Sequence, residues 1–169
     1  MYYVLWTNTG QEEKTRQMIY QYADSALYSR IAFPYRLKRH YYNRKSRIVK
    51  LILFPSYIFI DTDRIEEFVD NIKWFPGFNV ILHMDDIYCP VYEHEAVILN
   101  RLIAENEIID ISQGYKEGDK VHVINGPLVG MEGQIKKVKP RQGVAILEMN
   151  IFNRKMEVSL GLELIEKQK

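Results

Sequence analysis

The most distinctive chemistry in this sequence lies in a basic, tyrosine-containing segment between Asp24 and Asp61. Eight lysines and arginines fall there, and no acidic residue accompanies them. Fixed cations neutralise phosphates, and tyrosine rings stack on exposed bases, so this composition favours contact with RNA or DNA without distinguishing the two. The alternative is a solubilising hairpin whose tyrosines lie on a core face. The candidate nucleic-acid contacts are Arg36, Lys38, Arg39, His40, Arg44, Lys45, Arg47 and Lys50.

A second group of candidate residues is aromatic and follows one predicted strand. Tyr57 and Phe59 alternate along this strand, so their side chains share one of its faces. If helices cover only the opposite face, these rings form an exposed aromatic patch, which usually marks a partner site. The alternative is that the protein's own core covers both faces. Together with Trp6 and Phe54, these two residues make up the candidate partner-binding set.

No combination of residues in the sequence meets the requirements of catalysis or metal binding. The four histidines are scattered without a partner at ligand spacing, and Cys89, the only cysteine, lacks a CxxC partner. The triplet Glu93 to Glu95 is the densest titratable cluster, but adjacent residues of a helix point to different faces. We therefore expect no catalytic residue, no bound metal and no cofactor.

The charge of the chain is segregated along its length. The formal net charge of +1 hides −1 over residues 1–24, +8 over residues 25–60, −10 over residues 61–119 and +4 over residues 120–169. Regions of one charge sign attract partners of the opposite charge, so this segregation indicates charged partners. The apolar content of 47% is enough for a core, and the longest apolar run is too short to span a bilayer. No signal sequence precedes the first strand, so a cytoplasmic protein is expected.

Periodicity predicts alternating strands and helices in the first 105 residues. An aromatic and β-branched start indicates a strand, and helix formers with glutamates in the first turn follow it. Basic and bulky residues then alternate around residues 43–46, which is typical of two antiparallel strands joined by an exposed turn. The predicted elements are a strand at Tyr2 to Thr7, a helix at Gln11 to Tyr22, a hairpin at Phe33 to Lys50, a strand at Leu51 to Ile60 bent at Pro55, a helix capped by Asp63 and ending before Phe75, a strand at Asn79 to His83 and a helix at Tyr92 to Glu105.

The chain changes character after residue 105. Residues 106–116 are acidic and weakly patterned, which predicts a linker. Short strands separated by glycines follow, and they can cover their apolar faces only by curling into a small barrel. The predicted strands are Lys120 to Ile124, Gln134 to Val138, Val144 to Met149 and Lys155 to Ser159, with turn glycines Gly126, Gly130 and Gly133. The fold class is therefore α+β, with a domain at residues 1–105, the linker, and a barrel at residues 117–169.

The segment VHVINGPLVGMEGQIKKV at residues 121–138 resembles a KOW motif, and its setting resembles the C-terminal domain of NusG-type transcription elongation factors. Further segments are similar to family elements in the family's order: the first strand with the helix start, FPSY at residues 54–57, and IFNR at residues 151–154. Tyr2, Ser56 and Asn153 depart from the family, which commonly has tryptophan, glycine and glycine there. None of these departures removes an apolar anchor.

This resemblance implies an antiparallel sheet with helices of the NusG N-terminal type, joined to an SH3-like KOW barrel. It implies that Trp6, Phe54, Tyr57 and Phe59 bind the clamp helices of the largest RNA polymerase subunit, which would disfavour the paused enzyme. It also implies that the barrel contacts a ribosomal small-subunit protein or the Rho termination factor around Ile151, Phe152 and Arg154. The alternative is that the first two of these complete the barrel's own core. We expect a non-enzymatic monomer with no membrane partner.

The basic hairpin, the helix start and the compact length are most similar to LoaP, a specialised antiterminator within the family. That resemblance implies recruitment by an RNA hairpin in the nascent leader, which the basic segment would read, with non-template DNA as a further candidate partner. The expected function is suppression of pausing and termination. The competing predictions are a general NusG-like factor and a ribosome-associated KOW protein that binds RNA.

Overall fold

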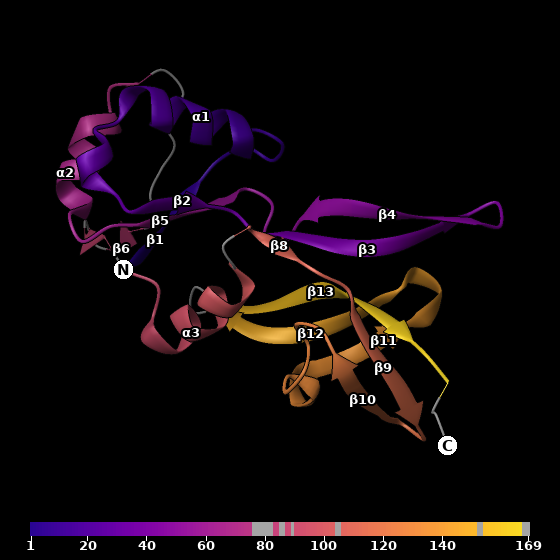
Figure 1. Ribbon diagram of the computed structural model, residues 1–169. Coiled ribbons are helices and arrows are strands. Elements are labelled where there is room, and N and C mark those ends of the chain that lie inside the picture. The colour runs from indigo at the N-terminus through magenta and orange to yellow at the C-terminus, as the bar shows by residue number, and fades with distance from the viewer. Residues whose placement is uncertain (76–82, 85–86, 89, 104–105, 152–153, 167–169) are drawn as a thin grey trace. The chain divides into compact units, whose positions relative to one another are not determined.

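The chain forms two compact units, and the first is interrupted in sequence by part of the second. The computed structural model describes residues 1–75, 83–84, 87–88, 90–103, 106–151 and 154–166 (Figure 1). One unit comprises Met1–Phe33 and Phe54–Val97, and the other comprises Pro34–Leu53 and Ile98–Lys169. The basic hairpin thus groups with the barrel, although its sequence position predicts a place in the N-terminal domain.

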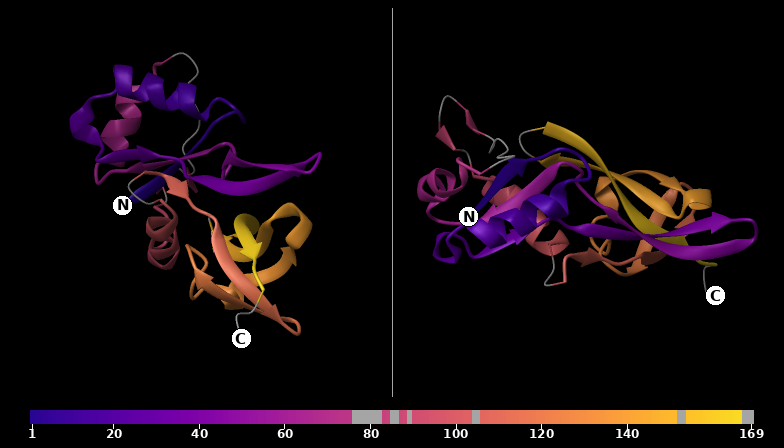
Figure 2. Two further views of the ribbon diagram at one scale, coloured as in Figure 1. Left: turned by 45° about the vertical axis from the view of Figure 1, so that its right-hand side comes forward. Right: turned by 90° about the horizontal axis from the view of Figure 1, so that it is seen from above.

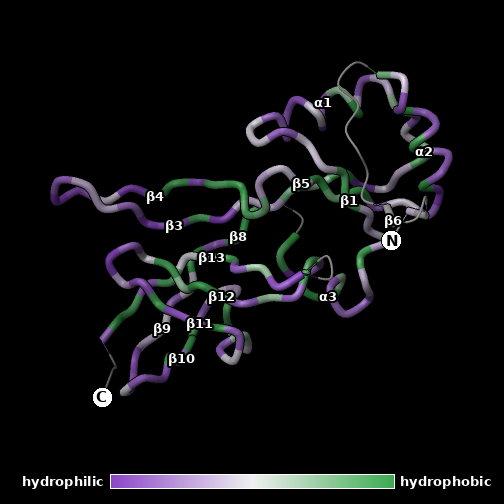
Figure 3. Tube along the Cα trace, turned by 180° about the vertical axis from the view of Figure 1, so that it is seen from behind, coloured by the Kyte–Doolittle hydropathy of each residue, from purple (hydrophilic) through white to green (hydrophobic). Residues whose placement is uncertain are grey.

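The first unit is built on a three-stranded antiparallel sheet with the order β1-β5-β2. Two helices, α1 and α2, lie over one face of this sheet (Figures 1 and 2). Hydrophobic residues run along β1 and β5 (Figure 3), and the isoleucines of β5 are fully buried. The elements are β1 (Tyr2–Trp6), α1 (Glu12–Tyr22), a short 3₁₀ turn (Ser25–Leu27), β2 (Arg30–Ala32), β5 (Tyr57–Asp61), α2 (Ile65–Ile72), β6 (His83–Met84) and β7 (Ile87–Tyr88).

A third helix, α3 (Glu93–Leu102), follows these strands and agrees with the helix predicted from Tyr92. The strand expected at Asn79 to His83 lies outside the described residues, apart from its last residue, which begins β6. Among the helices that the structure describes, none has both the length and the apolar character needed to cross a membrane.

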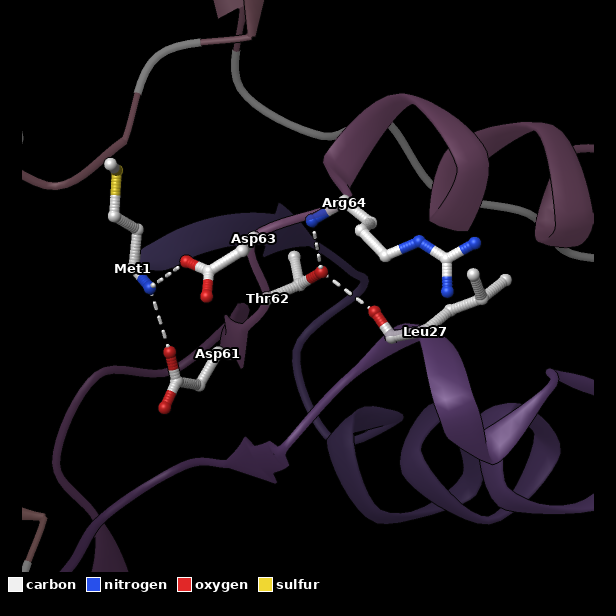
Figure 4. A network of polar contacts seen from close by, with 6 residues as sticks. All are labelled: Met1, Leu27, Asp61, Thr62, Asp63 and Arg64. Carbon is white, nitrogen blue, oxygen red and sulfur yellow. Dashed lines mark hydrogen bonds and ion pairs between the residues drawn. The ribbon is translucent and has the colours of Figure 1, made fainter.

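The start of α2 is stabilised by Thr62 and not by the predicted cap, Asp63 (Figure 4). The Thr62 hydroxyl accepts a hydrogen bond from the backbone N–H of Arg64 at 2.9 Å and donates one to the carbonyl of Leu27 at 2.6 Å. The Asp63 carboxylate instead accepts a hydrogen bond from the amino group of Met1 at 3.3 Å. Thr62 is buried, so its hydroxyl joins α2 to the turn that precedes β2.

The predicted basic hairpin is confirmed as two eight-residue strands, β3 (Tyr35–Tyr42) and β4 (Lys45–Ile52), in antiparallel register. A short strand, β8 (Ile108–Ile109), pairs in parallel with the start of β3. The single strand expected from Leu51 to Ile60 is wrong, because the chain turns between β4 and β5. Ser56 has a φ of +74° in that turn, which breaks the extended backbone.

The C-terminal residues form the predicted barrel, a five-stranded sheet with the order β10-β9-β13-β12-β11. Its longest strand pairs antiparallel with β12 and parallel with β9. Residues 106–116, expected as a linker, contain β8 and most of β9. The strands are β9 (Ser112–Glu117), β10 (Lys120–Asn125), β11 (Ile135–Lys139), β12 (Val144–Ile151) and β13 (Arg154–Leu164). The predicted α+β class is confirmed.

Two of the three turn glycines of the barrel need to be glycine for their backbone conformation. Gly126 has a φ of +95°, and a Cβ there would lie 2.6 Å from the Cα of Ser112. Gly130 also has a positive φ, of +76°, but faces open space. Gly133 has no positive φ and no close neighbour. The close approach at Gly126 lets the buried Ser112 hydroxyl accept a hydrogen bond from the N–H of Leu128 at 3.0 Å.

Candidate functional site

The aromatic candidates divide into an exposed pair and a buried pair. Trp6 at the end of β1 stands opposite Tyr57 at the start of β5, so their side chains share one face of the sheet. Trp6 is 43% exposed and Tyr57 is half-buried. Two large aromatic side chains therefore meet at this end of the sheet, where another molecule can reach them.

Phe54 and Phe59 are core residues, which corrects the prediction that they line an exposed patch. Their exposed fractions are 1% and 0%. Their rings meet edge-on with centroids 5.8 Å apart, and Tyr2 meets the ring of Phe59 in the same way at 6.5 Å. Strand alternation places Phe59 on the same face as Tyr57. The rings of Tyr2 and Phe54 cover this face at Phe59 but leave it accessible at Tyr57.

The turn before Tyr57 is held by a buried carboxylate that sequence analysis does not identify. The Glu12 side chain, 1% exposed, accepts a hydrogen bond from the backbone N–H of Ser56 at 2.8 Å. The Ser56 hydroxyl shares a hydrogen bond with that of Thr9 at 2.6 Å, and its carbonyl accepts one from the N–H of Thr7 at 2.8 Å. These bonds fix the left-handed conformation of Ser56 and with it the position of Tyr57.

The turn of the basic hairpin carries a cation in an unusual backbone conformation. Asn43 and Arg44 have φ values of +47° and +61°. Two consecutive positive φ angles are typical of the tightest hairpin turns, where glycine usually follows asparagine. Arginine in this position exposes a fixed charge at the tip, at a cost in local backbone strain. The residues near the turn are also hydrophilic on both strands (Figure 3).

The register of the hairpin gathers most of the basic candidates on one face. Residues that stand opposite each other in an antiparallel pair share a face, and the faces alternate along each strand. We call one of them the cationic face, and its basic side chains are Arg36, Lys38, His40, Lys45 and Arg47. Among the described residues, none of these side chains has an ion-pair partner. Exposed Tyr42 lies on the same face near the turn.

Arg39 and Lys50, the other two strand cations, lie on the opposite face and already have partners. Arg39 forms an ion pair with Glu163 on β13. The ammonium of Lys50 lies 4.0 Å from the centre of the Tyr35 ring, within the range of a cation–π interaction. The eight predicted nucleic-acid contacts are therefore not alike in their surroundings. Sequence analysis does not identify Glu163, because a residue so distant in sequence gives no local signal.

One donor on the cationic face lacks a partner. The Nη1 atom of Arg36 is buried without a hydrogen bond to any described residue, and burial lowers the pKa of its guanidinium. Nearer the turn, an open hollow of about 730 Å³ is lined by Asn43, Ser46 and four side chains of this face, His40, Tyr42, Lys45 and Arg47. The hollow is lined by cations and an exposed tyrosine, and it is suited to an anionic ligand.

The candidate partner residues of the barrel separate in a similar way. Ile151, the last residue of β12, is fully buried and completes the barrel's core. Phe152 lies outside the described residues. Arg154, at the start of β13, is exposed and stands opposite Ile151 in the register. In the described parts of the chain, no three histidine, cysteine or acidic side chains are grouped as metal ligands.

Comparisons with known proteins identify the family. A family model described as "Transcription termination factor nusG" matches residues 1–100. The chain is similar to the transcription termination/antitermination protein NusG of Thermus thermophilus, with 26% identity over 131 residues, which cover 73% of this chain and 71% of the relative. It is also 26% identical over 174 aligned residues to the Bacillus subtilis protein of the same name, with 98% and 97% of the two chains covered.

A solved structure shares the fold. It is described as "Domain interaction in Thermotoga maritima NusG", with a TM-score of 0.56 and 24% identity, and the match covers 95% of this chain and 92% of that one. The relatives are transcription factors and not enzymes, in agreement with the sequence prediction. Because the family model spans more than half of the sequence and both relatives carry the family name, this chain belongs to the NusG family of transcription termination and antitermination factors.

Proposed function

We propose that this protein is an elongation and antitermination factor that binds RNA polymerase and is recruited by a structured RNA, as the resemblance to LoaP implies. The observation that carries the proposal is the cationic face of the hairpin, where five basic side chains lie together without ion-pair partners among the described residues. A general family member that acts only through polymerase has no need of such a surface. The N-terminal domain at residues 1–105 would supply the polymerase contact and the barrel a further contact.

The polymerase contact is proposed at Trp6 and Tyr57. Large aromatic side chains act as anchors at protein interfaces because they bury much area with few rotatable bonds. Phe54 and Phe59 support this pair from the core and do not touch the partner. The expected target is the pair of clamp helices in the largest polymerase subunit. Binding there favours the closed enzyme only to the extent that the protein binds that conformation more tightly.

The nucleic-acid contact is proposed at the cationic face, with an RNA stem-loop as the preferred ligand. The strand cations suit the phosphates of the stem. Tyr42 is 70% exposed beside the basic hollow, where a base from an unpaired loop can stack on its ring. Arg44 at the turn adds a fixed charge near the same point.

The barrel is proposed to contact a ribosomal small-subunit protein or Rho through Arg154. Its side chain is exposed at the end of the barrel, whereas the neighbouring Ile151 is buried and serves the core. Charge reversal, Arg154→Glu, should therefore weaken capture of either partner without lowering the melting temperature. Unchanged capture of both would remove Arg154 from the site.

Co-purification with RNA polymerase tests the first contact. The double variant Trp6→Ala with Tyr57→Ala should lose the polymerase, whereas Trp74→Ala should retain it. Trp74 is a suitable control because it is 80% exposed in the same unit, away from the proposed pair in sequence. Retention of polymerase by the double variant would move the contact elsewhere. Capture of ribosomal subunits in place of polymerase would favour the ribosome-associated alternative.

Binding to a labelled RNA stem-loop, compared with a DNA duplex of the same length, tests the second contact. The variant Lys38→Ala with Arg47→Ala should weaken binding. It should also make the fall of log affinity with log salt less steep, by roughly 0.7 for each phosphate that is no longer neutralised. A charge-matched control, Lys14→Ala with Lys73→Ala, removes two cations outside the hairpin. Equal losses of affinity in the two variants would reduce the effect to net charge and remove the hairpin from the site.

A further inference from the structure

We infer that barrel strand β13 holds the basic hairpin in place, and that Arg39 positions the cationic face without contacting phosphate. The functional part of this inference depends on the proposed nucleic-acid role of the hairpin, whereas the docking can be tested without any ligand. The inference gives the barrel a part in nucleic-acid recognition and assigns a role to Glu163, Gly161 and Gly143.

The first support is the close approach of two backbones. Strand β3 packs against β13 (Figure 1), and a Cβ on Gly161 would stand 2.4 Å from the carbonyl oxygen of Leu37. The same Cβ would be 3.0 Å from Cγ1 of Ile111, so it has no space on either side. Gly161 has no positive φ, and the backbone angle therefore does not require glycine. Its lack of a side chain is what permits β3 to pack there.

A second glycine lies against the same strand. Gly143 has a φ of +63°, and a Cβ there would lie 3.2 Å from the carbonyl oxygen of Arg39. Gly143 precedes β12 and Gly161 lies in β13, and the two residues are linked through Val144, which stands opposite Gly161 in the register. Gly161 in β13 and Gly143 just before β12 are thus two positions without a side chain that face the same strand of the hairpin.

The third support is the ion pair between Arg39 and Glu163. The Arg39 Nε donates to a Glu163 carboxylate oxygen, and the side chains are 32% and 23% exposed. Glu163 and Gly161 are two residues apart in β13, so they face the same side of that strand. The hydrogen bond to Glu163 raises the pKa of Arg39. The guanidinium is thereby directed to the barrel, away from the cationic face.

Docking explains how a two-stranded hairpin can present a fixed surface. Beyond Arg36, where the pairing with β8 ends, the hairpin is a ribbon of two strands, which is marginally stable by itself in water. An undocked hairpin would therefore sample many orientations. Binding of a polyanion would then carry the entropic cost of ordering the strands and their long side chains. A hairpin held on β13 is ordered in advance. The barrel therefore raises the affinity for nucleic acid without touching the ligand.

Two neighbouring residues on opposite faces provide the sharpest test. Both Lys38→Gln and Arg39→Gln remove one cation from β3, and each variant is titrated with the labelled RNA stem-loop over a range of salt concentrations. The Lys38 variant should lower the salt slope by about 0.7 to 0.9, because one fewer phosphate is neutralised. The Arg39 variant should bind severalfold more weakly with an unchanged slope. An equal fall in slope for Arg39→Gln would make it a phosphate contact and overturn its positioning role.

The docking itself is tested by hydrogen exchange of the β3 amides in the full chain without ligand. Gly161→Ala should speed exchange along β3 and weaken binding of the stem-loop about tenfold. Gly133→Ala is the matched control, since a Cβ there meets nothing within 4 Å and the residue lies in the same barrel. Unchanged exchange in Gly161→Ala would overturn the docking.

A charge exchange provides a second variant should alanine at Gly161 disturb the barrel itself. Arg39→Glu or Glu163→Arg alone should speed exchange along β3, and the two together should restore it. Absence of rescue, with the barrel intact by circular dichroism, overturns the ion pair as a docking contact. If the wild-type protein does not bind the stem-loop at all, the proposed nucleic-acid role fails, and the exchange results still decide whether β13 holds the hairpin.

Discussion

Two aromatic residues on the same face of β5 should respond to alanine substitution in opposite ways. Phe59 is completely buried and meets two other rings edge-on, so Phe59→Ala removes a core side chain and both of its ring–ring interactions. Substitutions of this kind cost about 3–5 kcal/mol of unfolding free energy. With about 2–4 °C of melting temperature per kcal/mol for a chain of this size, the decrease is roughly 6–20 °C. Because Tyr57 is half-buried, Tyr57→Ala should lower the unfolding free energy by only about 1 kcal/mol.

Thermal unfolding followed by circular dichroism measures both effects, and Phe59→Leu is the control that keeps most of the apolar volume. Polymerase capture is then compared at a temperature where every variant is folded. There, Phe59→Ala should retain polymerase and Tyr57→Ala should lose it. A melting temperature for Phe59→Ala within about 2 °C of the wild type, against the decrease expected for a core ring, would refute the placement of this ring in the core.

Three further predictions concern stability. Thr62→Val removes the hydroxyl partner of the buried Leu27 carbonyl and of the partly buried Arg64 N–H, and it should lower the unfolding free energy by about 1–3 kcal/mol, measured by urea denaturation. Gly126→Ala should unfold the barrel at a lower temperature, as seen by calorimetry, because the new Cβ meets Ser112 and alanine is strained at this positive φ. The hydrogen bond from Lys155 holds the pKa of Glu148 below its ordinary value of 4.5. The stabilisation that the ionised Glu148 gains from Lys155 is present above about pH 4.5 and disappears as the pH falls through the lowered pKa. Glu148→Gln should therefore reduce the change of melting temperature with pH in that acidic range.

The sequence predicts what depends on residues near each other in the chain. The hairpin is recognisable because basic and bulky residues alternate about a turn containing Asn43, and the two strands that result are neighbours in sequence. The barrel is recognisable from short strands and glycines within about 50 residues. Helix α1 is located to within one residue because its apolar and polar positions follow the helical period.

Long-range interactions explain the predictions that fail. Lys38 and Arg39 are adjacent cations in the sequence, and strand alternation puts them on opposite faces. Only the contact with Glu163, 124 residues away from Arg39, shows which of the two faces is already occupied. Likewise, strand alternation cannot separate Tyr57 from Phe59, since the rings that bury Phe59 come from a different strand and a turn. The polar composition of residues 106–116 predicts a linker. They form strands through backbone pairing with β3, β10 and β13, which side-chain composition does not reveal.

The discontinuous second unit has a consequence for biosynthesis. Arg39 and Glu163 are 124 residues apart, so at typical translation rates of about 5–20 residues per second the hairpin waits roughly 6 to 25 seconds for its docking strand. During that time it is a pair of open strand edges on the ribosome, a form that is prone to aggregate. The seven lysines and arginines of the hairpin keep such edges apart through mutual repulsion. The same charges that suit the finished protein to nucleic acid thus protect the nascent chain before the barrel exists.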